Sequence, residues 1–249
     1  MLTEGRFTRY ILYALGEIIL VVIGILIALQ INNWSEHQKE VRLEQEYYCR
    51  LAEDVVSDQE QMLNLISLAE DRLKFSNDAV RLLLNEEAKK IEAGQLIALS
   101  TRAIYSDFQL NNSAYEDLKS GANLNIIRDK TLIKTLNEYF NKVEELKSII
   151  MINGKYAVDI AFKHTDNFAN GNNQASILSG RFSKGLDEDL KKAFPIDRNE
   201  TLTDEMKERL LGEALEYVSV NTRQVELYGL LLSEIDELLE LLGEKCASE

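Results

Sequence analysis

Residues 10–31 read YILYALGEIILVVIGILIALQI, and this stretch decides how the whole chain is interpreted. Glu17 is its one charged residue and Gln30 its one amide. A helix of this length spans roughly 33 Å, about the thickness of the hydrocarbon core of a bilayer. The apolar run is too long for a signal peptide, and no small-residue cleavage site follows it. We therefore predict a transmembrane helix over residues 10–34, after a short tail at residues 1–9.

Aromatic residues flank the apolar run at both ends. Tyr10 and Tyr13 precede most of it and Trp34 follows it, and such rings favour the interface between lipid and water. We interpret these three residues as interface anchors, so the lipid bilayer is the first expected partner. Arg6, Arg9 and the free amine precede the segment, whereas Lys39 and Arg42 follow it among several glutamates. This slight bias of positive charge predicts a single-pass inner-membrane protein with a cytoplasmic N-terminus and a periplasmic C-terminal domain.

One face of the predicted membrane helix carries small residues at steps of three and four. Gly24 and Ala28 form a small-xxx-small pair, which lets helix backbones approach closely in lipid. A carboxylate in hydrocarbon costs at least about 2.5 kcal/mol, so Glu17 either meets a partner or proton pathway, or snorkels to the headgroups. We predict a packing face for a homo-oligomer, with other membrane proteins as further candidate partners. Its residues are Ala14, Glu17, Val21, Gly24, Ala28 and Ile31.

The rest of the chain reads as almost wholly helical. It contains a single proline, and no Gly or Pro lies between Trp34 and Gly94. Apolar residues recur at helical spacing through most of residues 35–249. The expected fold is therefore all-α: an N-terminal transmembrane helix, continued by an elongated antiparallel helical bundle. The expected long helices cover residues 35–85, 129–168 and 203–242, and the short ones residues 92–105 and 113–120.

Local signals mark where several of these helices begin. Ser113 and Glu116 have the spacing of a capping box, and Asp129 and Thr203 are predicted caps of the two later long helices. Residues 169–185 are rich in Gly, Asn and Ser and are interpreted as a loop. Pro195 is expected to break the chain before the final helix.

Residues that could carry chemistry are few. His37 and His164 lie in no metal-ligand spacing, and no nucleotide-binding or nucleophile motif occurs. We therefore expect no metal, no cofactor and no enzymatic activity. The net charge of -14 makes nucleic acid a poor partner. An up-down-up-down bundle would bring Cys246 to the same end as Cys49, and a disulfide between them is a hypothesis that requires an oxidising compartment.

Two stretches resemble a known family. Residues 10–34, with the sequence YILYALGEIILVVIGILIALQINNW, look like the N-terminal signature of uncharacterised single-span Bacteroidota membrane proteins. Residues 112–121 (NSAYEDLKSG) and 123–128 (NLNIIR) are similar to a second motif of that group. The resemblance implies an inner-membrane protein with its helical domain outside. This chain has a shorter and less basic N-terminal tail than many members of the group.

Three functional hypotheses remain open. The first is a structural or interaction protein that self-associates through its membrane helix and presents a periplasmic bundle. The second is a periplasmic ligand-sensing bundle, against which stands the expectation that residues 1–9 leave no room for a cytoplasmic output domain. The third is an ion- or proton-conducting oligomer that uses Glu17.

Overall fold

The described part of the chain is helical, apart from one isolated β-bridge between Lys89 and Thr201. The computed structural model describes residues 4–104, 108–120, 125–163, 185–193 and 196–247. The prediction of an all-α chain is confirmed for these residues. The first helix, α1 (Glu4–Leu83), runs for 80 residues without a break and joins the apolar segment to the domain. Its length follows from a sequence that offers no proline to interrupt it.

The buried positions of α1 recur every three or four residues along the domain. This is the heptad spacing of coiled coils, which keeps one seam of a helix facing its partners over a long distance. The seam consists of Leu51, Val55, Asp58, Met62, Leu65, Ala69, Arg72, Ser76, Ala79 and Leu83. Three of its members are polar or charged, which is unusual for a buried seam.

Five further helices follow in the described part of the chain. They are α2 (Lys90–Ser100), α3 (Ser113–Ser120), α4 (Lys130–Lys163), α6 (Glu188–Ala193) and α7 (Asp204–Ala247). The sequence predicts no helix at α6, and α7 continues past the expected end at residue 242. Except for residue 185, the predicted loop at 169–185 lies outside the described residues, as do Pro195 and the expected helical residues 164–168.

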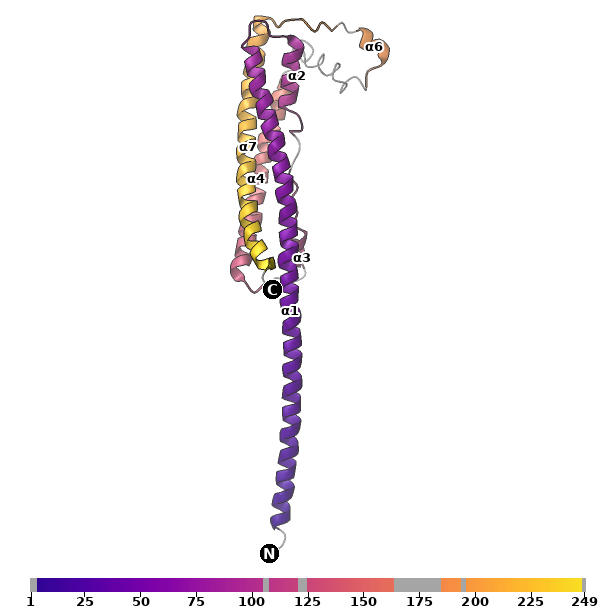
Figure 1. Cartoon of the computed structure of the whole chain (residues 1–249), viewed down its shortest axis with the longest axis vertical. Coiled ribbons are helices and arrows are strands. Elements are labelled where there is room, and N and C mark those ends of the chain that lie inside the picture. Colours follow the sequence, from indigo (N-terminus) through magenta and orange to yellow (C-terminus); the bar gives the residue numbers. More distant parts are fainter. Residues whose placement is uncertain (1–3, 105–107, 121–124, 164–184, 194–195, 248–249) are drawn as a thin grey trace.

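Helix α7 lies beside α1 and runs in the opposite direction (Figure 1). We call the end of the domain from which the apolar segment of α1 emerges its base. There, Cys49 is bonded to Cys246 near the end of α7. Further along α1, Arg72 contacts Asn221, which comes earlier in α7. Helix α4 packs against α7, and the short helices α2 and α3 pack against α1.

The core contains two apolar clusters, one after the other along the helices. One is built by α1, α3, α4 and α7, and the other by α1, α2, α4 and α7. A set of buried polar residues lies between them, and we call it the polar layer: Arg72, Ser76, Asn221 and Gln224. These residues separate the two apolar clusters along α1 and α7.

Nearby side chains cap the starts of α4 and α7, whereas a side chain distant in the chain holds the start of α3. The Asp129 carboxylate accepts hydrogen bonds from the backbone of α4, and the Thr203 hydroxyl accepts one from Met206 at 3.3 Å. The predicted capping box at Ser113 is wrong. The Ser113 hydroxyl donates to Asp54 of α1, and the Glu116 amide donates to the backbone of Asn112.

Candidate functional site

The apolar part of α1 extends alone beyond the other helices (Figure 1). It is the one segment of the described chain that is long and apolar enough to cross a membrane, with a mean hydropathy of 2.6 and no buried residue in its most apolar window. Leu20, for example, is 74% exposed. Exposed apolar surface of this extent marks contact with a membrane or another protein.

The predicted packing face is uncovered along its whole length. All six of its residues, from Ala14 to Ile31, are exposed, and nothing lies within 4 Å of a methyl group placed on Gly24. Of the predicted interface anchors, Tyr13 is 84% and Trp34 65% exposed. The side chain of Tyr10 lies outside the described part. The role of these residues in lipid stays a prediction.

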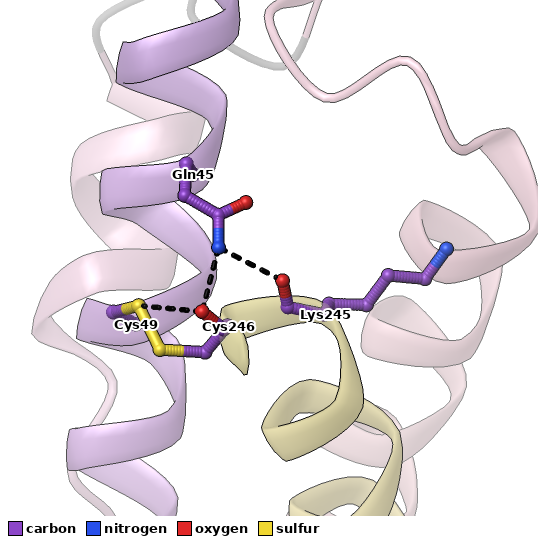
Figure 2. The surroundings of a disulfide bond; sticks show 4 residues. All are labelled: Gln45, Cys49, Lys245 and Cys246. Atoms are coloured by element: carbon purple, nitrogen blue, oxygen red, sulfur yellow. Dashed lines mark hydrogen bonds between the residues drawn. A yellow bond between two sulfur atoms is a disulfide. The ribbon is translucent and has the colours of Figure 1, made fainter. Parts of the chain in front are cut away.

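The base of the domain is held by what we call the base clamp: Gln45, Cys49, Lys245 and Cys246. Cys49 and Cys246 form a disulfide, as hypothesised from the helix order, with their Cα atoms 4.9 Å apart. The Gln45 side-chain amide donates to the carbonyls of Lys245 at 3.0 Å and Cys246 at 2.7 Å (Figure 2). The last carbonyls of a helix have no partner within the helix, so Gln45 caps α7 from α1.

The segment before α4 is attached to the same stretch of α1. The Arg128 guanidinium contacts Glu40 at 3.3 Å and the ring of His37 at 3.1 Å, and its backbone amide donates to Glu44 at 2.7 Å. The next residue, Asp129, pairs with Lys245 at 2.7 Å. These hydrogen bonds to Lys245 and to the α4 backbone hold the pKa of Asp129 below its usual value. The segment before α4 is therefore attached both to α1 and to the last turn of α7.

The second family motif, residues 112–121, packs against acidic and polar residues of α1. Asp54 accepts hydrogen bonds from the Ser113 hydroxyl and from the Ala114 amide, the latter at 2.9 Å. Arg50 pairs with Asp117 at 2.9 Å. These contacts hold α3 against α1, so the motif has a structural role.

Two buried carboxyl groups have altered acidity. Asp58 accepts two hydrogen bonds from Asn111, and burial raises the pKa of Asp58 to about 6. Burial also raises the pKa of Glu213 to about 7, although the Tyr217 hydroxyl donates to it at 3.1 Å. Both groups lie within the helix packing, where their carboxyl groups serve as internal hydrogen-bond acceptors.

Three members of the polar layer, Arg72, Asn221 and Ser76, are linked by hydrogen bonds. Arg72 donates to Asn221 at 3.2 Å, and Asn221 in turn donates to the Ser76 hydroxyl at 3.1 Å and to the Ser100 carbonyl at 3.0 Å. The Tyr228 hydroxyl also contacts the guanidinium, while burial lowers the pKa of Arg72. Within the described residues, Arg72 takes part in no ion pair, so neutral oxygen atoms stabilise its charge.

No group of three or more His, Cys, Asp or Glu side chains is placed to hold a metal ion within the described residues. His37 contacts Arg128, and His164 lies outside the described part. The sequence analysis missed Gln45, Asp54, Arg72 and Asn221. None of them stands in a recognisable motif, because each acts on a residue far away in the chain.

In the part of the chain that the structure describes, the protein is all-helical and has one candidate membrane-spanning helix near its N-terminus. Residues 17–155 match the model of a family of unknown function (DUF6090). The match covers more than half of the chain, which therefore belongs to this family. No curated protein and no solved structure matches the chain. The matched region begins at Glu17 and takes in the second motif.

Proposed function

We propose that this protein is a membrane-anchored helical structural or interaction protein, which self-associates through its membrane helix and presents its bundle in the periplasm. The observation that carries the proposal is the exposure of residues 13–31. Burying one Leu, Ile or Val side chain contributes roughly 1.5–3 kcal/mol. A run of such residues on a lone helix is therefore strongly driven into lipid.

The disulfide supports a periplasmic location for the bundle. Cys49 and Cys246 lie on the domain side of the apolar segment. Disulfides persist in oxidising compartments such as the periplasm and are rare in the cytosol. The disulfide is thus an argument for a periplasmic domain that is independent of the slight charge bias around the membrane helix.

The direction of the packing face is compatible with pairing between two copies. Gly24 and Glu60 are separated by about ten turns of α1 at about 3.6 residues per turn, so they lie on the same side of the helix. Glu60 is exposed, whereas Met62, about 200° further around the helix, belongs to the buried seam. The packing face therefore points away from the bundle of its own chain, and two copies can approach without a collision of their domains.

Extraction of membranes with alkaline carbonate tests the anchor. The full chain, expressed in a Gram-negative host, is expected to stay in the membrane pellet. A variant with Val22→Lys and Ile25→Lys is the control, because each lysine near the helix centre costs roughly 3 kcal/mol of insertion and favours release. A wild-type chain found in the soluble fraction would overturn the proposal.

The mass of the detergent-solubilised chain tests self-association. Light scattering in mild detergent is expected to give an oligomer for the wild type and a smaller species for Gly24→Ile, which blocks close approach of the backbones. Leu26→Ile, on the side of α1 that faces away from Gly24, serves as the matched control and is expected to keep the wild-type mass. A strict monomer unaffected by Gly24→Ile contradicts this part of the proposal.

A further inference from the structure

The last turn of α7 is held to the domain mainly by the base clamp. Leu242 is the last residue of α7 with a fully buried side chain, and Gly243 and Glu244 are exposed. The turn that follows is fixed by the disulfide and by the amide of Gln45 (Figure 2). The ion pair between Lys245 and Asp129 also holds it. Cys246 is half-buried and packs against the edge of the apolar core, so the disulfide lies at the margin of the core.

Cys49 and Cys246 are both half-buried, and neither is enclosed within the core. Cys49 lies on the surface of α1 and Cys246 is one residue before the last helical residue, Ala247. A disulfide that joins a terminal turn to the surface of a folded helix can open without disrupting the core. This distinguishes it from a bridge between two core elements.

The Asp129 carboxylate connects this turn to the start of α4. One oxygen of Asp129 accepts hydrogen bonds from the amides of Thr131 at 3.0 Å and Leu132 at 3.1 Å, and thereby caps α4. Its other oxygen accepts the hydrogen bond from Lys245 at 2.7 Å. Lys245 is the neighbour of Cys246 in the chain, so movement of the cysteine moves the lysine.

We propose that the Cys49–Cys246 disulfide is a redox latch, opened by a dithiol such as that of a thiol–disulfide oxidoreductase. One thiolate of the dithiol attacks a sulfur of the bridge, and its second thiol resolves the mixed disulfide. The products are two cysteine thiols and an oxidised dithiol. Opening frees the last turn of α7, separates Lys245 from Asp129 and loosens the first turn of α4, while the core stays folded.

Hydrogen exchange of the full chain in detergent micelles tests the latch, with and without dithiothreitol, and with thiol labelling to count free cysteines. On reduction, exchange at residues 243–247 is expected to accelerate by at least about tenfold. At residues 131–134 it is expected to accelerate by roughly threefold, as loss of a part-exposed ion pair allows. Exchange at residues 62–69, in the core of α1, is expected to stay unchanged.

Two variants separate the latch from simple fraying of a helix end. Cys49→Ala with Cys246→Ala is expected to show the fast exchange at both sites without dithiothreitol. In Asp129→Asn the α4 cap remains but the ionic pair is gone, so reduction should release α7 without a change in α4. The proposal is overturned if α4 does not respond in the wild type, if residues 62–69 lose protection on reduction, or if labelling finds two free thiols before reduction.

Discussion

The guanidinium of Arg72 on α1 donates a hydrogen bond to the amide oxygen of Asn221 on α7, with 3.2 Å between Nε and Oδ1. Both side chains are buried, with exposed fractions of 2% and 0%. The pair lies in the polar layer between the two apolar clusters. In a heptad seam a buried polar residue can fix the register of the helices at a cost in stability. A slip of α7 along α1 would remove the acceptors that α7 provides for this buried charge.

The first prediction concerns that pair. Asn221→Leu keeps the branched side-chain shape but removes an acceptor from a buried charge, and we expect it to lower the free energy of unfolding by about 1–3 kcal/mol. The double variant with Arg72→Met removes both partners and should recover most of the loss. Urea unfolding of the detergent-solubilised chain, followed by circular dichroism, measures both. An additive or larger loss in the double variant would contradict the register argument.

The second prediction concerns pH. Burial raises the pKa of Glu213 from 4.5 to about 7, so the folded state retains a proton that the unfolded state loses. The resulting stabilisation is fully present below pH 4.5 and disappears as the pH rises to about 7, with an upper limit of about 3 kcal/mol. Glu213→Gln should flatten this slope when the melting temperature is measured from about pH 4 to about pH 8. Glu240→Gln, at an exposed position further along α7, is the control, and an equal slope in all three proteins would refute the assignment.

The third prediction concerns the second family motif. Asp54→Ala removes the acceptor for the Ser113 hydroxyl and the Ala114 amide, and we expect a loss of about 1–2 kcal/mol in stability. The exposed neighbour Glu53 provides the control, because Glu53→Ala should change stability by less than about 0.5 kcal/mol. Urea unfolding measures both variants. Equal effects would mean that Asp54 does not hold the start of α3.

The fourth prediction follows from the direction of the packing face. In membranes, Ala28→Cys is expected to form a cross-link between copies with a short bifunctional maleimide, whereas Leu26→Cys on the opposite side of the helix is not. Glu60→Cys, on the same side but within the domain, should also fail to link. At the level of the domain, acidic side chains on two parallel copies repel each other. This repulsion keeps the two α1 helices apart above the membrane. Cross-linking is read from gels, and efficient linkage through Leu26→Cys would show that a different face pairs.

Much of the secondary structure follows from the sequence, because it rests on short-range interactions. The spacing of apolar residues in α1 and the absence of proline predict a long helix, and the structure has one. Asp129 and Thr203 cap helices whose amides lie two or three residues further along the chain, so local spacing is sufficient to find them. The apolar run at residues 10–31 is recognised in the same way.

Other features depend on contacts between residues that are distant in the chain. The capping box at Ser113 fails because Asp54, 59 residues earlier, offers a charged acceptor that forms the stronger hydrogen bond. The hypothesis of a bridge between Cys49 and Cys246 came from the order of the helices, but only the packing of α7 on α1 brings the two sulfurs together.

The sequence by itself determined an acidic, all-helical chain with one apolar helix of membrane length, since composition and periodicity are properties of neighbouring residues. The tertiary structure alone decided the polar layer, the base clamp and the side of α1 that the other helices cover. Each of these depends on which faces of α1 are covered by other helices. That choice is made when the helices pack, and no local pattern records it.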